Sequence, residues 1–181
     1  DQPATPGSNA ALAEQAFQRA LELNPDLSMA HHLYAMHEDE MGRSVPAMVR
    51  LLKRAATRPA DAELFAGLCH ACRYSGLLHA SIAAHERGHR IDPSVPTSVS
   101  FTLYSLGEFE RSRETEQVEP RWNRALALID LGREAEALEA WRAMPTSNSS
   151  PAARAVIDCY ISVVERRPQD AITNIEHLLG T

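Results

Sequence analysis

The sequence contains little that would tie the protein to a membrane or to an oxidising compartment. No window of its 181 residues approaches the roughly 18 uninterrupted apolar residues that a membrane-spanning helix needs. Residues 1–9 lack the basic end and the apolar core of a signal peptide. The three cysteines, Cys69, Cys72 and Cys159, form an odd set in a chain long enough to bury a core without disulfides. We therefore expect a soluble, cytoplasmic protein of a reducing compartment, without a membrane partner.

Positive charge and phosphate-binding motifs are also scarce. The chain carries 18 Lys and Arg against 24 Asp and Glu, which gives a formal net charge of −6. Nucleic-acid binding needs clustered positive charge, so we expect no nucleic-acid partner. The sequence has neither a glycine-rich phosphate loop nor a G-x-S-x-G nucleophile turn. We therefore expect neither a cofactor nor an enzymatic activity.

A repeat with a period of 34 residues is the strongest positive signal. It is clearest in residues 62–93, where Gly76 separates two helical stretches and Pro93 ends the second. A shift of 34 residues aligns four sets of positions: Pro25, Pro59 and Pro93; Gly42 and Gly76; Ala13, Ala47 and Ser81; Phe17, Leu51 and His85. A fixed period of this length indicates stacked structural repeats.

Apolar residues at helical spacing predict helices along the chain and no strands. Residues 1–9 are expected to form a flexible tail, and Ser28 is expected to cap the second helix. The predicted helices cover 10–23, 28–41, 44–57, 62–75, 78–91, a shortened segment between Pro96 and Gly107, the residues after Gly107, 120–131, 134–144, and, after a loop at 146–150, 151–165 and 169–179. The chain is thus predicted to be an all-α repeat domain over residues 10–181, with clear repeats at 10–93 and degenerate repeats at 94–181.

The repeated positions resemble a known family. The residues that carry the resemblance are Ala13-x3-Phe17-x2-Ala20-x4-Pro25, followed by Tyr34-Ala35, Gly42 and Ala47. This pattern resembles the tetratricopeptide repeat, closely over residues 12–93 and less closely beyond. Arg54 and His85 depart from it, where the family has a small and a large apolar residue. The resemblance implies an α-α superhelix, a right-handed solenoid of about five antiparallel helix pairs.

In that family the first helix of each pair lines a concave groove that binds protein or peptide segments. The resemblance therefore implies a partner-binding groove, in which Arg73 beside Asp39 and Glu40 would select charge. The basic clamp of chaperone-binding members is missing, since His32 and Met36 stand at its positions. The alternative is that some of these side chains pack between helices. The implied groove residues are His32, Met36, Asp39, Glu40, His70, Arg73, Tyr74, Phe101 and Tyr104, with Trp122 as a further candidate.

Two motifs contain residue types that bind metals. His85-Glu86-x-x-His89 fits the H-E-x-x-H pattern, in which two His on one helix face hold zinc and the Glu acts as general base. His85 stands at a packing position of the repeat, and a third ligand would be needed. Cys69-x-x-Cys72 is a single pair, whereas structural zinc commonly takes two such pairs. We therefore expect both motifs to pack rather than to bind metal.

Three functions remain open on the sequence. We favour a non-catalytic scaffold for protein–protein interactions. The second is the regulatory region of a larger bacterial signalling protein, such as a kinase, a cyclase or a transcription regulator. The third and least favoured is a zinc metalloprotease that acts through His85, Glu86 and His89. Pairing of an end repeat with a second copy of the chain, as a homo-oligomer, also stays open.

Overall fold

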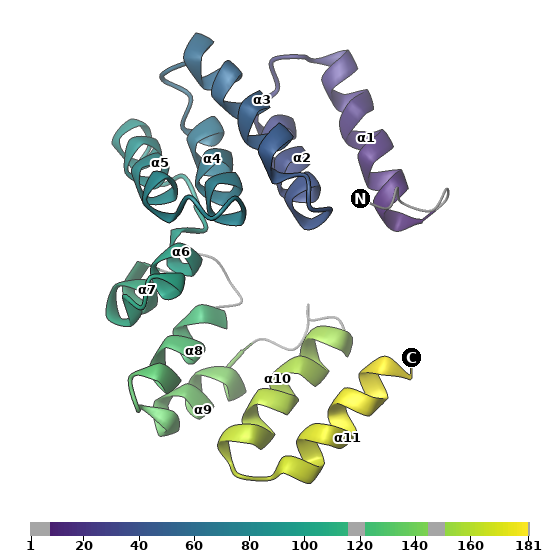
Figure 1. Ribbon diagram of the computed structural model, residues 1–181, viewed down its shortest axis with the longest axis vertical. Helices are drawn as coiled ribbons and strands as arrows, with labels where there is room; N and C mark the ends of the chain where they lie inside the picture. The colour runs from purple at the N-terminus through teal and green to yellow at the C-terminus, as the bar shows by residue number, and fades with distance from the viewer. Residues whose placement is uncertain (1–7, 116–121, 145–150, 181) are drawn as a thin grey trace. The chain divides into compact units, whose positions relative to one another are not determined.

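The computed structural model describes residues 8–115, 122–144 and 151–180. Within these ranges every regular element is an α-helix and no strand occurs, which confirms the all-α prediction (Figure 1). None of the described helices is long and apolar enough to cross a membrane. The chain forms two compact units, Asp1–Leu106 and Gly107–Thr181, and each has a buried core of its own.

The first unit is built from helices that pack against their neighbours in the chain. They are α1 Asn9–Leu23, α2 Ser28–Glu40, α3 Ser44–Thr57, α4 Ala62–Tyr74, α5 Leu78–Ile91 and α6 Val99–Ser105. These bounds agree closely with the predicted ranges, and α6 is short as expected. α4 is the central element, because it contacts α2, α3, α5 and α6.

Glycines at the 34-residue period close the turns between paired helices. Gly42 and Gly76 both have φ of +74°, a left-handed conformation that other residues rarely adopt. Beyond Gly42, the backbone N–H of Arg43 donates to the carbonyl of Glu38 at 2.8 Å, and the same bond follows Gly76. This bond satisfies a carbonyl that the end of the helix would otherwise leave unpaired. The repeat in the sequence thus reflects a repeated turn.

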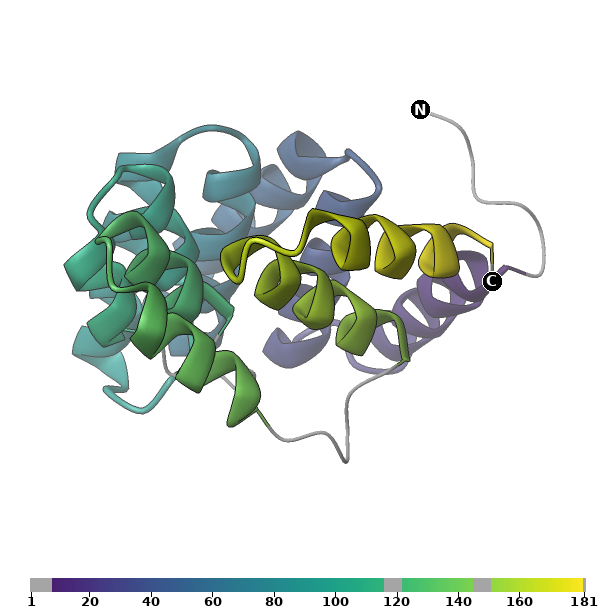
Figure 2. The same cartoon turned by 90° about the horizontal axis from the view of Figure 1, so that it is seen from below.

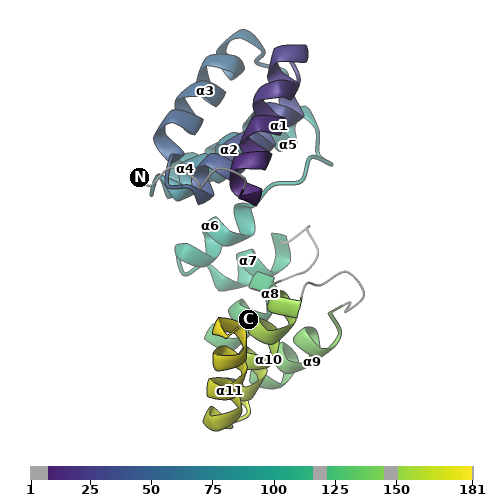
Figure 3. The ribbon, with the colours of Figure 1, turned by 90° about the vertical axis from the view of Figure 1, so that its right-hand side faces the viewer.

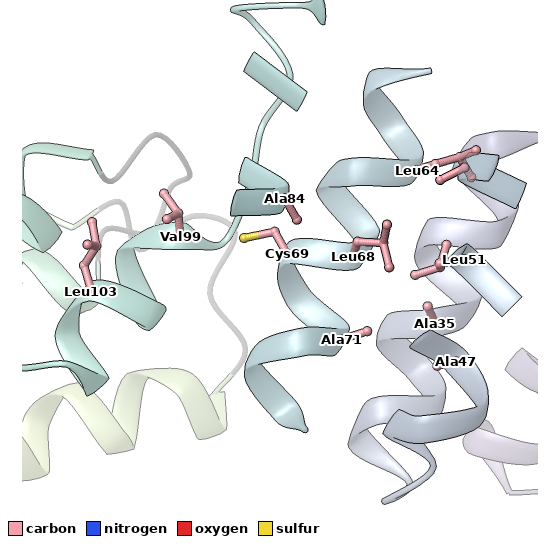
Figure 4. Packing of buried hydrophobic residues seen from close by; sticks show 11 residues of the cluster. Ala35, Ala47, Leu51, Leu64, Leu68, Cys69, Ala71, Ala84, Val99 and Leu103 are labelled. Atoms are coloured by element: carbon pink, nitrogen blue, oxygen red, sulfur yellow. The ribbon is translucent and has the colours of Figure 1, made fainter. Parts of the chain in front are cut away.

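α4 contributes to the core on two of its sides. Figure 4 shows Leu68 directed toward Leu51 of α3, while Cys69 points the other way, toward Ala84 of α5. Ala35 of α2 is fully buried in the same cluster. Small residues at such positions let the helix backbones approach closely, so the core of this unit depends on alanine as much as on leucine.

Gly67 of α4 marks a close approach of this kind, and the repeat pattern does not single it out. A Cβ atom at this position would lie 3.1 Å from Cδ1 of Leu51 and 3.3 Å from Cα of His32. Both neighbours belong to packed helices, so the absence of a side chain at Gly67 sets the spacing of α4 against α2 and α3.

The second unit contains a separate cluster of buried side chains. Its helices are α7 Phe109–Thr115, α8 Trp122–Asp130, α9 Glu134–Arg142, α10 Pro151–Val164 and α11 Pro168–Leu179. Trp141 of α9 is buried with Leu128 and Ile157, and its ring stacks on Tyr160 with 5.4 Å between centroids. α10 and α11 lie side by side, as Figures 2 and 3 show.

Several local expectations differ from the structure. α1 begins at Asn9, one residue inside the predicted tail, because the Ser8 side chain accepts a bond from the N–H of Ala11. Ser28 is the first residue of α2 rather than its cap, and its hydroxyl donates to Asp61 at 2.5 Å. The predicted tail residues 1–7, the start of the helix expected at 120 and the loop expected at 146–150 lie outside the described residues.

Candidate partner-binding surface

The residues implied as a groove lie on α2, α4 and α6 of the first unit. α4 packs against both other helices, so all three contribute to one packed region. Glu40, Tyr74 and Phe101 are exposed, while Asp39 and His70 are buried. The remaining predicted residues, which are half-buried, are His32, Met36, Arg73 and Tyr104. Trp122 belongs to the second unit, and its side chain lies outside the described part of the chain.

Five of these residues are joined by contacts, and we call them the Arg73 cluster: Asp39, His70, Arg73, Tyr74 and Phe101. The guanidinium carbon of Arg73 lies 4.6 Å from the centroid of the Tyr74 ring and 5.2 Å from that of the Phe101 ring. Tyr74 remains 45% exposed and Phe101 40% exposed. A cation held against two rings in this way is stabilised electrostatically by the ring faces. Part of both rings is left open for another molecule.

His70 holds Arg73 from the buried side of the cluster. Nη2 of Arg73 donates to Nδ1 of His70 at 3.2 Å, and the His70 ring stacks on Tyr74 with 4.7 Å between centroids. Arginine can only donate, so Nδ1 is the acceptor and the proton of the neutral ring is on Nε2. Burial first, and then the charge of Arg73, lower the pKa of His70 to about 3. His70 is therefore neutral at physiological pH.

Asp39 lies behind His70 rather than at the surface. Its Oδ2 is 3.8 Å from Nε2 of His70, and its side chain has no exposed area. Burial raises the pKa of Asp39 to about 6; Glu38 acts in the same direction, while Ser44 and Arg73 oppose it. The expectation that Asp39 selects charge in a partner is therefore wrong, because no partner can reach the carboxylate. Of the two acids named for that role, only Glu40 is exposed.

His32 of α2 has a partner that the sequence did not suggest. Its Nδ1 makes a short contact with Oε1 of Glu63, at the beginning of α4. The pair joins α2 to α4 on the same side as the Arg73 cluster, where His32 also acts on the pKa of His70. Glu63 lies 31 positions further along the chain, which is not the 34-residue period, so neither the local pattern nor the repeat pairs it with His32.

The H-E-x-x-H motif of α5 positions a connecting segment. Nδ1 of His85 is 2.7 Å from the hydroxyl of Thr97, and Nε2 of His89 donates to the carbonyl of Val95 at 3.0 Å. The two His rings lie against each other, with 4.1 Å between centroids. In this arrangement the imidazoles fasten the segment that leads into α6. Across the described residues, no group of three or more His, Cys, Asp or Glu side chains is placed to hold a metal ion.

The C-x-x-C motif of α4 is part of the core. Cys69 and Cys72 are both buried as free thiols. Sγ of Cys69 lies 3.4 Å from the Ser81 hydroxyl, and Sγ of Cys72 lies 3.8 Å from the Met48 sulfur. Burial raises the pKa of both thiols, which disfavours the reactive thiolate.

A surface pocket of about 590 Å³ is formed by two inter-helix connections of the first unit. Its charged groups already have partners: Arg58 pairs with Asp61 at 3.2 Å, and Asp92 accepts from the backbone of Ser94 at 2.9 Å. Glu63 also lines it and contacts His32. The charged side chains of the pocket are therefore engaged within the protein, whereas the Arg73 cluster leaves the Tyr74 and Phe101 rings partly exposed to a partner.

Comparison with models of known protein families gives no match, and no characterised protein with a similar sequence is found. A function for the chain therefore has to be argued from its own geometry.

Proposed function

We propose that the protein is a non-catalytic scaffold that binds a peptide or protein segment on the surface formed by α2, α4 and α6. The observation that carries the proposal is the Arg73 cluster, in which a guanidinium is held against two partly exposed rings. Tyr and Arg are enriched among the few residues that dominate the affinity of protein interfaces. Tyr74, Phe101 and Arg73 would thus be the main contacts for a partner.

Preorganisation is the physical reason to favour this cluster over other exposed side chains. Immobilising a flexible side chain on binding costs about 0.5–1.5 kcal/mol. Arg73 is already held by two rings and by its bond to His70. A partner that binds the rings and the guanidinium would therefore not have to immobilise the Arg73 side chain, and this cost would not reduce its affinity.

The repeats supply the framework of the proposal. We take the helix pairs to be tetratricopeptide-like units that stack as an α-α superhelix. Two features support this: equal φ values at Gly42 and Gly76, 34 positions apart, and packing of each described helix of the first unit on its chain neighbour. In such a stack α2, α4 and α6 are the first helices of their pairs, and they line the inner surface that receives the partner.

The test is a selection of short peptides from a phage-displayed random library on the immobilised full chain. The affinity of each selected peptide is then measured by fluorescence anisotropy for wild type, for Phe101→Ala and for Arg90→Ala. Phe101 is partly exposed, so its truncation should leave the fold intact. Arg90 is exposed on α5, outside the proposed surface, and serves as the matched control.

The expected result is that Phe101→Ala weakens the selected peptides by about tenfold or more, corresponding to about 1.4 kcal/mol, while Arg90→Ala leaves the affinity unchanged. Peptides that bind both variants as tightly as wild type would place the binding surface elsewhere and refute the proposal.

A further inference from the structure

An apolar stripe runs along the solvent-facing side of α3. Val45, Val49 and Leu52 are 59%, 41% and 50% exposed, and Met41 precedes them at the end of α2 with 39%. The other side of α3 supplies the core, where Leu51 is fully buried. The stripe residues are therefore not part of the buried core of their own unit. Apolar side chains that adjoin one another at the surface commonly mark an interaction site.

The spacing of the stripe fits one kind of occupant. Val45, Val49, Leu52 and Ala56 follow one another at steps of four, three and four residues. This is the alternation of a heptad seam, whose members share one face of a helix. A second helix can pack lengthwise on such a seam at a shallow crossing angle. The stripe thus has the geometry to receive a helix that lies along α3.

The repeat itself does not require these residues to be apolar. One period earlier, the positions of Val49 and Leu52 are occupied on α1 by Gln15 and Gln18, which are exposed. One period later they are occupied on α5 by Ala83 and Glu86, which are exposed as well. Both positions are exposed in all three helices, but only α3 carries large apolar side chains at them. The apolar character therefore belongs to α3 and not to the fold.

The stripe has a basic edge. Lys53 follows Leu52, stands one helical turn after Val49 and is exposed. Residues 41–60 contain no acid, and their basic residues are Arg43, Arg50, Lys53, Arg54 and Arg58. Each of these arginines pairs with a carboxylate, whereas no ion pair of Lys53 is seen within the described residues. Lys53 is thus the cation of this segment that is available to a partner.

We propose that this stripe docks an amphipathic helix of a partner protein, whose apolar seam covers Val45, Val49 and Leu52 and whose edge facing Lys53 is acidic. The site is separate from the Arg73 cluster and does not depend on the function proposed for it. A second copy of α3 is a poor occupant, because its edge is also basic and like charges would meet across the interface. A bilayer is a poor one too, because an interfacial helix carries basic residues around a wide apolar face, whereas Met48 on the other edge packs against the core.

The experiment uses two synthetic helical peptides of equal length as probes, both with Leu at every seam position. One carries Glu and the other Lys at the positions that flank the seam. Fluorescence anisotropy gives the Kd of each peptide for the full chain. Because the net charge of the chain is −6, long-range attraction favours the Lys peptide. Tighter binding of the Glu peptide would therefore have to come from the positive charge of Lys53 beside the stripe, because the net charge of the chain acts against it.

Three variants locate the binding. Val45→Gln/Val49→Gln/Leu52→Gln replaces the stripe with the residue type found on α1, and Ala83→Gln makes a matched change on α5. Lys53→Glu reverses the charge of the edge. Circular dichroism verifies that all three fold.

The proposal expects the Glu peptide to bind wild type at least about tenfold more tightly than the Lys peptide. The triple variant should lose this binding, Ala83→Gln should keep it, and Lys53→Glu should abolish the preference. Equal binding of both peptides, or binding of the Glu peptide that survives in the triple variant, would overturn it. A wild-type dimer in sedimentation velocity that the triple variant dissociates would also overturn it, by assigning the stripe to a second copy.

Discussion

At the scale of single residues, His70 joins the parts of the proposed binding surface. It accepts from Arg73 on its own helix, lies 3.3 Å from the hydroxyl of Ser98 before α6, and faces Asp39 of α2. Its Nε2 lies 3.8 Å from a carboxylate oxygen of Asp39, whose pKa is raised by burial. The position of Arg73 therefore depends on a buried pair that a partner never touches.

This pair predicts a specific pH dependence of stability. The pKa of Asp39 is raised from 3.8 to about 6 in the folded state. Its contribution to the free energy of unfolding is therefore fully present below pH 4 and is lost as the pH rises through 6. Asp39→Asn removes this loss, so its stability relative to wild type should rise between pH 4 and pH 7. The upper bound of the change is about 3 kcal/mol, at about 1.4 kcal/mol per pKa unit.

Urea unfolding of both proteins at several pH values between 4 and 7.5 measures this difference. The wild-type profile alone would mislead, because the lowered pKa of His70 removes stability as the pH falls through 6.5. A difference between wild type and Asp39→Asn that stays constant with pH would contradict the assigned environment of Asp39.

Two glycines in helices predict opposite effects of the same substitution. Gly67→Ala places a Cβ 3.1 Å from Leu51 and 3.3 Å from the His32 backbone, so overpacking should outweigh the gain in helix propensity and destabilise by about 1–2 kcal/mol. Gly88→Ala meets its nearest atoms at 3.5 Å, an ordinary contact, and should stabilise by up to about 1 kcal/mol. Chemical denaturation of both variants checks the signs. Equal effects would show that α4 is not closely packed at Gly67.

At the scale of elements, α1 is the helix of the first unit that packs against the fewest other helices. Among the described helices it packs against α2 alone. Glu14 of α1 accepts from both terminal nitrogens of Arg43, at 2.8 and 3.1 Å, and from the hydroxyl of Tyr34 at 3.0 Å. Phe17 stacks on the same Tyr34 ring. The Glu14 carboxylate thus makes most of the hydrogen bonds that hold α1 to the rest of the unit.

Removing that carboxylate should loosen α1 selectively. Glu14→Ala is expected to lower the free energy of opening of α1 by about 1 kcal/mol, since the pair is partly exposed. Hydrogen exchange of the α1 amides should therefore speed up several-fold, without a change in α4 and α5. Glu22→Ala is the control on the same helix, because its pair with Arg19 is largely exposed and should contribute little. Uniform acceleration across the unit would contradict this account.

Most elements could be predicted from the sequence because their signals are local. Helical spacing of apolar residues and periodic Gly and Pro mark each helix and turn, independently of what packs where. The repeat also placed Arg73, Tyr74 and Phe101 on adjacent helices, where two rings do meet the guanidinium. The burial of Asp39 and His70 could not be predicted, since it depends on how closely α4 approaches α2. That distance is set by Gly67, which carries no signal in the period.

At the scale of the whole molecule, each unit closes its own core. The buried cluster of the first unit runs from Ala35 to Val99 and Leu103, and that of the second from Ala125 to Ile157. Neither cluster needs a residue from the other unit. A fragment of residues 1–106 should therefore remain helical and unfold cooperatively in circular dichroism. A fragment that is largely unstructured, while the full chain is folded, would show that the cores depend on each other.

The most direct test of the proposed scaffold is site-specific photocrosslinking in cells of the source organism. A benzophenone amino acid replaces Tyr74 in one protein and Arg90 in another, both at exposed positions. The account predicts one defined crosslinked partner from position 74, none from position 90, and loss of the product from position 74 when Phe101→Ala is added. No product from position 74, or the same products from both positions, would contradict a binding surface on α2, α4 and α6.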